Sequence, residues 1–326
     1  MNENFPPENW QAIIPILCQV AEVVESPVPQ RQPGHVLVHM QAAALNFADL
    51  LQAEGKYQEA RPTPFVPGLE GAGVVMETAP GCDLAVGDRV AVWSPGTMTR
   101  VMSVAADRCI KIPDGISFEQ AAGFQIAHGT SHLALTARAA LRSGEILAVL
   151  GAAGGVGLTA VEIGRAMGAR VIGIARGADK VQAVRDAGAD HVIDSAECDD
   201  LKAALRALGG VDVVYDPVGD VPGLQAFGAL KPGGRHLIIG FAGGKPPALP
   251  LNHALVKNIA IHGFYWGAYR DMDRDALYDS LRELFQMVQD GRLNPQPGHI
   301  LPLDQIAQGY AMLRNRKSIG KIVITM

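Results

Sequence analysis

Residues 147–158 read LAVLGAAGGVGL, and this stretch decides the fold. The apolar run 146–150 predicts a buried parallel strand, and residues 151–153 predict a tight turn after it. The glycines at 154, 155 and 157 then open an apolar-periodic helix, and a second strand follows at 170–174. Strand, turn, helix and strand in this order predict a βαβ unit with a glycine-rich first turn.

A turn of this kind is suited to binding the pyrophosphate of a dinucleotide. Glycines let the backbone approach a phosphate closely, and the first amides of the helix offer hydrogen-bond donors at the positive end of the helix dipole. The alternative is a glycine turn that serves helix packing alone. The expected pyrophosphate contacts are Ala153, Gly154, Gly155, Val156 and Gly157.

The residue at the end of the second strand indicates which nicotinamide cofactor binds. Folds that prefer NAD place an acidic residue about 20 residues beyond the glycines, whereas this chain has Arg176. Arg176 and Lys180, one helical turn later, are able to pair with a 2′-phosphate, so NADPH is the predicted cofactor. The alternative is that both are ordinary solvated charges and that Asp179 reaches the ribose.

Length and composition limit the classes of function. The chain has 326 residues, a net charge of −5 and ordinary apolar and charged fractions, so we expect a globular protein without nucleic acid as its main partner. No apolar segment approaches the length of a membrane span, and the N-terminus does not resemble a signal peptide, which predicts a cytoplasmic location. The four cysteines lack the spacing of a zinc site or a disulfide framework.

The pattern along the chain predicts two kinds of architecture. Short β-rich runs with Gly and Pro breaks over 34–102 indicate a compact, largely antiparallel domain. A helical stretch is expected over 118–141. Regular alternation of strands and helices over 145–267 then predicts an α/β, doubly wound parallel sheet. After it we expect helices over 273–290 and 303–313 and a closing strand over 319–325 in a tail that returns to the first domain.

Several spaced motifs run along nearly the whole chain: Asn46-Phe-Ala-Asp49, Gly55-Lys-Tyr57, Pro67-Gly-Leu-Glu-Gly-Ala-Gly-Val-Val75, Gly87-Asp-Arg-Val90, Ala152-Ala-Gly-Gly-Val-Gly157, Asp216-Pro-Val-Gly219 and Gly320-Lys321. With these motifs in this order, the chain resembles the medium-chain dehydrogenase/reductase superfamily, and most of all its NADPH:quinone oxidoreductase branch, the relatives of zeta-crystallin. The resemblance implies a GroES-like, mainly antiparallel catalytic domain over 1–122, completed by 268–326, and a Rossmann NADPH-binding domain over 123–267.

The same resemblance implies that no catalytic metal is bound. Zinc alcohol dehydrogenases of the superfamily carry Gly-His-Glu, where this chain has Leu69 before Glu70, and their cysteine ligand falls near Asn46. Glu70 is then interpreted as a buried structural carboxylate, with proton transfer as the alternative. His128 and His132 have i, i+4 spacing but no third ligand in view, so they are interpreted as helix-face histidines.

Without a Lewis acid, the expected substrate carries its own electron sink, and quinones and α,β-unsaturated carbonyls are of this kind. By resemblance, Asn46 and Tyr57 lie beside the nicotinamide and the substrate. There they hydrogen-bond the ribose or the accepting carbonyl, and Tyr57 is the expected substrate-orienting group. The alternative for Tyr57 is a loop aromatic packed at a domain junction. Asp49 is expected to brace that loop.

Further cofactor contacts are implied at positions that match the family. Thr130 and Phe241, after the strand that ends at Gly240, match residues beside the nicotinamide, and Arg316 matches an arginine that reaches the adenosine phosphate. A solvated charge is the alternative for Arg316. Where some relatives stack a tyrosine on the adenine, this chain has Asp194-Ser195, so Ser195 is the expected contact and stacking is weaker or comes from elsewhere.

The leading hypothesis from the sequence is therefore a zinc-independent, NADPH-dependent quinone reductase, with a homodimer expected by resemblance. The alternative within enzymes is an enone or enoyl-thioester reductase. The alternative of another class is an NADPH-binding protein that works by interaction or as a redox sensor without turnover.

Overall fold

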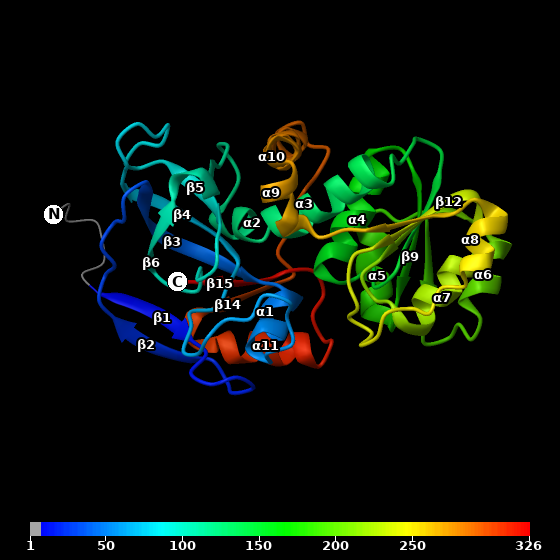
Figure 1. Cartoon of the computed structure of the whole chain (residues 1–326), viewed down its shortest axis with the longest axis horizontal. Helices are drawn as coiled ribbons and strands as arrows, with labels where there is room; N and C mark the ends of the chain where they lie inside the picture. Colours follow the sequence, from blue (N-terminus) through cyan, green and yellow to red (C-terminus); the bar gives the residue numbers. More distant parts are fainter. Residues whose placement is uncertain (1–7) are drawn as a thin grey trace. The chain divides into compact units, whose positions relative to one another are not determined.

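The computed structural model describes residues 8–326 and divides into two compact units. The first unit takes in the described residues up to Ile126 together with Pro295–Met326, and the second unit is Ala127–Asn294. In Figure 1 the first unit is blue to cyan and red, and the second is green to orange. Each unit has its own sheet and its own core, so each is described separately.

The second unit contains a six-stranded sheet that is parallel throughout, in the order β10-β9-β8-β11-β12-β13 (Figure 1). This confirms the doubly wound parallel sheet predicted from the alternating pattern. The strands are β8 (Ile146–Val149), β9 (Arg170–Ala175), β10 (His191–Asp194), β11 (Val211–Asp216), β12 (Leu230–Ile238) and β13 (Ala260–Gly263).

The helices of this unit follow from the order of its strands. From β8 the chain moves outward to β9 and β10, then returns to β11 on the other side of β8. Right-handed crossovers therefore place α4 and α5 on one face of the sheet and α6, α7 and α8 on the other. The helices are α3 (Gln125–Leu133), the π-helical η2 (Ala134–Arg138), α4 (Gly155–Ala166), α5 (Ala178–Asp186), α6 (Leu201–Ala207), α7 (Asp220–Gly228), α8 (Leu251–Lys257), η3 (Trp266–Ala268), α9 (Tyr269–Met272) and α10 (Arg274–Gln289).

The core under α6 and α7 shows why these strands form. Ile172, Val214 and Leu150 on the sheet pack with Leu205 of α6 and Phe227 of α7, and all five are buried. Strands covered on both faces need continuous apolar runs, which is the pattern that these segments have. Burial of such side chains contributes roughly 1.5–3 kcal/mol each.

The helical stretch expected over 118–141 is interrupted in the structure. α2 (Phe118–Ala122) ends at the C-cap Gly123, and α3 begins two residues later. Glycine is a poor helix former, and here it also leaves room for a neighbour, because a Cβ on Gly123 would lie 3.4 Å from the side chain of Lys321. The break brings the first turn of α3 to Glu70, which accepts the backbone N–H of Ile126.

The first unit is built on a seven-stranded sheet in the order β14-β15-β3-β4-β5-β7, with β6 also paired to β3. All pairs are antiparallel except β14 with β15, and a separate hairpin joins β1 to β2. This sheet confirms the mainly antiparallel domain. Its elements are β1 (Asn9–Ile13), β2 (Glu22–Ser26), β3 (His35–Leu45), α1 (Phe47–Ala53), β4 (Glu70–Glu77), β5 (Arg89–Trp93), β6 (Val101–Ala105), η1 (Ala106–Arg108), β7 (Cys109–Lys111), α2, β14 (His299–Pro302), η4 (Leu303–Gln305), α11 (Ile306–Arg314) and β15 (Ile322–Thr325).

The register of three neighbouring strands positions the polar residues of this unit. Ile322 of β15 pairs with Leu45 of β3, and Ala44 of β3 pairs with Glu70 of β4. The residues just beyond these pairs, Asn46 and Lys321, therefore lie next to Glu70 although they are far apart in the sequence. Within residues 8–326, no helix combines the length and the apolar character that crossing a bilayer requires.

Candidate functional site

The carboxyl edge of the parallel sheet brings together most of the cofactor contacts expected from the sequence. The chain leaves β8 toward β9 on one side, and β11 lies on the other side of β8, so the strand order reverses at this point. Ligands of doubly wound sheets bind outside the carboxyl ends of the strands at such a point. Four segments end there: residues 153–157 after β8, Arg176 after β9, Ser195 after β10, and Gly240 with Phe241 after β12.

The loop after β8 has the close backbone packing that predicts a phosphate cradle. Gly154 is the N-cap of α4, and its carbonyl accepts the N–H of Gly157 at 3.1 Å. A Cβ on Gly157 would lie 2.3 Å from the carbonyl oxygen of Gly151, so no other residue fits there without moving the backbone. The N–H groups of Gly157 and Leu158 bond the Gly154 carbonyl, and those of Gly155 and Val156 open at this loop. The loop therefore fits a pyrophosphate.

Asp194, the last residue of β10, links the ends of the paired strands β9 and β10. Its Oδ1 accepts the N–H of Gly177 at 3.0 Å and the N–H of Ala196 at 2.8 Å. These bonds, with a smaller contribution from the charge of Arg176, hold the pKa of Asp194 below its usual range. Arg176 and Ser195 are exposed, and Lys180 is half-buried on the first turn of α5. The cationic group at the end of β9 is thus accessible, as a 2′-phosphate site requires.

The loops after β11 and β12 are held by a buried Asp–His pair that the sequence reasoning missed. Asp216 Oδ1 accepts the N–H groups of Val218 at 2.9 Å and Gly219 at 2.7 Å, and His236 Nε2 lies 3.1 Å from Oδ2. Both side chains are at most 1% exposed. The motif Asp216-Pro-Val-Gly219 was noted, but its partner on β12 is visible only in the fold. The pair fixes the turn opposite Phe241, which is exposed.

Thr130 lies on α3 beside a cluster of buried hydroxyl groups. The Oγ of its neighbour Ser131 lies 3.0 Å from the carbonyl oxygen of Val156, 2.8 Å from Thr159 Oγ1 and 2.9 Å from the hydroxyl of Tyr215. Ser131 thereby ties α3 to the first turn of α4 and to the end of β11. The sequence reasoning identified Thr130 and Val156 but missed this connection, since serine and threonine in a helix carry no pattern of their own.

In the first unit, Asn46 belongs to a buried polar cluster, defined here as Asn46, Asp49, Glu70 and Lys321. Asn46 Nδ2 donates to Glu70 Oε1 at 3.0 Å, and Lys321 Nζ donates to the same oxygen at 2.7 Å and to Asn46 Oδ1 at 2.6 Å. The other oxygen of Glu70 accepts the N–H of Ile126 at 2.8 Å. Glu70 is fully buried with three donors, which fits the structural interpretation of this residue.

Asp49 braces the loop that carries Asn46, as expected. Its two carboxylate oxygens accept the N–H of Asn46 at 2.8 Å and the N–H of Gly68 at 3.1 Å. The side chain is fully buried, and desolvation raises the pKa of Asp49 to about 6, because the two backbone hydrogen bonds and Lys321 offset only part of that effect.

Two further expected residues of the first unit lie elsewhere along the chain. Tyr57 is half-buried in the loop after α1, whereas Asn46 is the N-cap of α1, so the two flank the same helix. Arg316 is exposed in the turn after α11, where its φ is +55°. The assignments of Tyr57 and Arg316 remain predictions.

The two histidines at i, i+4 spacing face different partners. His128 Nε2 lies 3.7 Å from Glu162 Oε2, while His132 Nδ1 lies 2.9 Å from Ser280 Oγ and its Nε2 lies 3.6 Å from Glu283 Oε2. Burial lowers the pKa of His132. Among the residues that the structure describes, no three His, Cys, Asp or Glu side chains gather in a way that would hold a metal ion.

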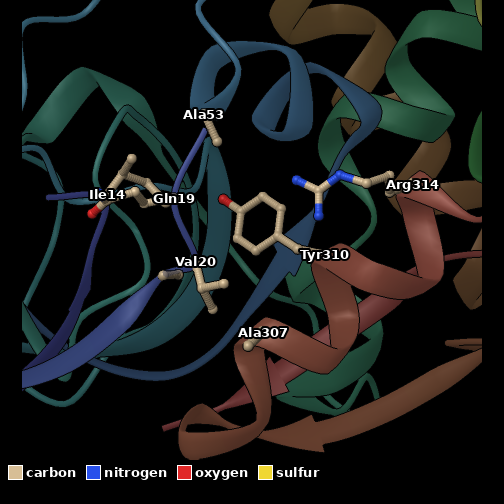
Figure 2. A pocket seen from close by; sticks show the side chains of 8 residues that line it. Ile14, Gln19, Val20, Ala53, Ala307, Tyr310 and Arg314 are labelled. Carbon is tan, nitrogen blue, oxygen red and sulfur yellow. The ribbon is translucent and has the colours of Figure 1, made fainter. Parts of the chain in front are cut away.

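A small cavity opens in the first unit between α1, α11 and residues 14–21. Figure 2 shows the Tyr310 side chain extending from α11 toward Gln19 and Ala53, with Arg314 beside it. The Tyr310 hydroxyl has no hydrogen-bond partner in the described part of the chain, and the cavity of about 20 Å³ has room for one water. Burial raises the pKa of Tyr310. The cavity contains none of the expected site residues.

Comparisons with known proteins agree with this arrangement. Residues 155–284 match the zinc-binding dehydrogenase family, and residues 32–114 match the alcohol dehydrogenase GroES-like domain. The quinone oxidoreductase-like protein 2 of Bos taurus is 35% identical over 321 residues, which cover 94% of this chain and 88% of that protein.

Solved structures of similar proteins share the fold over nearly the whole chain. The quinone oxidoreductase of Thermus thermophilus, described also in complex with NADPH, has a TM-score of 0.84 at 29% identity and covers 97% of this chain and 100% of its own. The quinone oxidoreductase of Pseudomonas syringae has a TM-score of 0.89 at 27% identity and covers 98% of this chain and 100% of its own.

Proposed function

Because the chain belongs to the medium-chain dehydrogenase/reductase superfamily, we propose that it is an NADPH-dependent oxidoreductase that reduces quinones without a metal ion. The observation that carries the proposal is the carboxyl edge of the parallel sheet, where the glycine loop after β8 stands beside an exposed Arg176 rather than an acidic residue. The named quinone oxidoreductases among the similar proteins support the choice of acceptor.

Residues of the second unit are proposed to bind and orient the cofactor. The loop 153–157 would hold the pyrophosphate with the amides that its own hydrogen bonds leave free, and Arg176 with Lys180 would pair with the 2′-phosphate. Thr130, Ser195, Gly240 and Phe241 would make further contacts with the cofactor, and Arg316, which belongs to the first unit, is proposed to reach the adenosine phosphate. When bound there, NADPH supplies the hydride.

Residues of the first unit are proposed to orient the acceptor. Leu69 offers no metal ligand, and Asn46 Oδ1 and Glu70 Oε1 both accept a hydrogen bond from the ammonium of Lys321. Such a site favours a substrate that delocalises the negative charge itself, and a quinone does so. Asn46 and Tyr57 would then hydrogen-bond the ribose or the accepting carbonyl and hold it in place.

Steady-state turnover tests the proposal directly. The purified chain is mixed with NADPH or NADH and a panel of ortho- and para-quinones, small enones and enoyl-CoAs, each with and without EDTA. We expect turnover of quinones with NADPH that EDTA leaves unchanged, and Tyr57→Phe should lower kcat for quinones without weakening NADPH binding.

Activity confined to enones or enoyl-CoAs would show that the protein reduces alkenes and not quinones. NADPH binding with no turnover in the whole panel would favour a non-catalytic role, and loss of turnover with EDTA would contradict a metal-free site.

A homodimer is also proposed, and two exposed features of the second unit support it. Leu251, Leu255 and Val256 of α8 are all more than 60% exposed, and β13 is an edge strand of the parallel sheet. Exposed apolar side chains next to an unpaired edge are typical of an interface. Light scattering should give twice the mass of the chain, and Val256→Asp should reduce it; a monomer at high protein concentration would contradict the proposal.

A further inference from the structure

Lys321 uses all of its hydrogen-bonding capacity inside the buried polar cluster. Its Nζ donates to Asn46 Oδ1 at 2.6 Å, to Glu70 Oε1 at 2.7 Å and to the carbonyl oxygen of Leu45 at 3.2 Å, and the residue is 8% exposed. An ammonium group has three donors and no acceptor. Lys321 therefore has no hydrogen left to give to a bound molecule, and any influence on a reaction has to pass through its neighbours.

The neighbour that Lys321 orients is Asn46. A lysine only donates and a carboxylate only accepts, so the side-chain oxygen of Asn46 must face Lys321 and its nitrogen must face Glu70. One hydrogen of Asn46 Nδ2 goes to Glu70 Oε1 at 3.0 Å. The second hydrogen has no acceptor among residues 8–326, so Asn46 presents an N–H donor rather than a carbonyl oxygen.

We propose that Lys321 is a positioning residue that locks the side-chain amide of Asn46 with its free N–H available for the ligand. This inference rests on the proposed function, in which Asn46 contacts the ribose or the accepting carbonyl. An N–H donor at that place stabilises negative charge that develops on a carbonyl oxygen, whereas a flipped amide would present a second acceptor and oppose it.

Replacing Lys321 by methionine unlocks the amide. Asn46 Oδ1 then loses its donor, and only the bond from Asn46 Nδ2 to Glu70 Oε1 still holds the amide. A side chain held by one hydrogen bond samples more orientations than one held by two, so the free N–H faces the ligand only part of the time.

A double-mutant cycle in the full chain tests this step. We expect Lys321→Met to lower kcat for a quinone about tenfold with NADPH affinity little changed, the size expected for one hydrogen bond at the reacting group. In an Asn46→Ala background the same Lys321→Met should leave kcat unchanged. Equal losses of kcat in both backgrounds would overturn the proposal, because Lys321 would then act independently of Asn46.

Two further variants separate this effect from a loss of folding. Lys321→Met combined with Glu70→Gln removes both charges together, so it should fold where the single variant does not, and it should show the same loss of kcat. Lys231→Met is the matched control: its Nζ lies 2.9 Å from Asp212 Oδ2 in a partly buried ion pair outside the cluster. It should lower stability and leave kcat unchanged. A loss of kcat in Lys231→Met as large as that in Lys321→Met would contradict a specific role.

A measurement that does not depend on turnover tests the role of Lys321 separately from the proposed function. The ¹H–¹⁵N signals of the Asn46 side-chain amide, assigned by their absence in Asn46→Ala, should form one pair in the wild type. They should shift and exchange with water about tenfold faster in Lys321→Met, as expected when one buried hydrogen bond is lost. If the chain reduced no quinone but these signals changed as expected, the proposed function would fail and the positioning role would stand. Unchanged signals would refute the positioning role whatever the activity.

Discussion

Asp194 Oδ1 accepts the backbone N–H of Gly177 at 3.0 Å, so the carboxylate at the end of β10 is bonded to the backbone at the start of α5. Gly177 has a φ of +88° and is the N-cap of that helix. The Asp194 carboxylate thus serves the fold, while Arg176 remains exposed. Asp194 therefore stabilises the loop, whereas Arg176 is the group that would contact the cofactor.

Arg176→Glu should shift the cofactor preference toward NADH. A charge-assisted hydrogen bond to a phosphate contributes about 1.5–3 kcal/mol. The ratio of kcat/KM for NADPH to kcat/KM for NADH should therefore decrease by a factor of about 10 to 100. Arg170→Glu is the matched control, because Arg170 is an exposed arginine at the opposite end of the same strand. An equal change in both variants, or none in Arg176→Glu, would remove Arg176 from the phosphate site.

Gly157→Ala should damage both the fold and cofactor binding. The added Cβ would lie 2.3 Å from the Gly151 carbonyl oxygen and 2.8 Å from the backbone of Ala152, and only a backbone shift relieves such a contact. Overpacking of this kind costs about 1–3 kcal/mol, and NADPH affinity should fall at least about tenfold as the amides move. Denaturant unfolding and fluorescence titration measure the two effects.

Gly154→Ala is the comparison for the same loop. Its Cβ would have no neighbour closer than the Gly151 carbonyl oxygen at 3.3 Å, and its φ of −78° suits any residue. Stability should therefore stay near that of the wild type, while a methyl group in the cradle weakens NADPH binding. If Gly154→Ala bound NADPH as tightly as the wild type, the phosphate would not lie against this loop.

Local patterns predicted the second unit well because its chemistry is local. The strand, the glycines and Arg176 are close in sequence, and a βαβ unit brings them together by itself. The buried polar cluster is different, because Lys321 reaches Asn46 and Glu70 only through the pairing of β15 with β3 and of β3 with β4. The motif Gly320-Lys321 marked the position, but no spacing rule gives its partners. The partners His236 and Asp216, and likewise Tyr215 and Ser131, are also far apart in the sequence and meet only in the fold.

Asp49 should make stability fall as pH rises through the weakly acidic range. Its pKa is 3.8 in a model peptide and about 6 in the fold, so the folded state prefers the protonated form. The stabilisation is fully present below about pH 4 and is lost as pH rises to about 6 and beyond. Relative to Asp49→Asn, which does not titrate, the free energy of unfolding of the wild type should fall by about 3 kcal/mol across this window.

Asp88 provides a control of opposite sign. The N–H of Ala85 and the ammonium of Lys111 hold the pKa of Asp88 below its usual range, so its stabilisation is present at neutral pH and is lost as pH falls. Relative to Asp88→Asn, the wild type should therefore gain stability as pH rises. A pH-independent difference between the wild type and Asp49→Asn would show that Asp49 has the same pKa in the folded and the unfolded chain.

Ser131→Ala should cost more stability than Tyr215→Phe. The Ser131 hydroxyl lies within 3.0 Å of the Val156 carbonyl oxygen, Thr159 Oγ1 and the Tyr215 hydroxyl, and its removal leaves the buried Tyr215 hydroxyl without that partner. We expect a loss of about 1–3 kcal/mol for Ser131→Ala and about 1 kcal/mol for Tyr215→Phe. Because the phenyl ring introduced by Tyr215→Phe needs no hydrogen bond, the double variant should cost less than the sum of the two.

The same variants test whether this cluster serves the cofactor loop as well as the core. Ser131 holds α3, which carries Thr130, against the first turn of α4, so Ser131→Ala should also weaken NADPH binding, whereas Tyr215→Phe should leave it nearly unchanged because Ser131 keeps its bond to Val156. Denaturant unfolding gives the stabilities, and a fluorescence titration gives the affinities. Strictly additive stabilities would mean that Ser131 and Tyr215 do not interact. Equal NADPH affinities in the wild type, Ser131→Ala and Tyr215→Phe would show that this hydroxyl cluster contributes to packing alone.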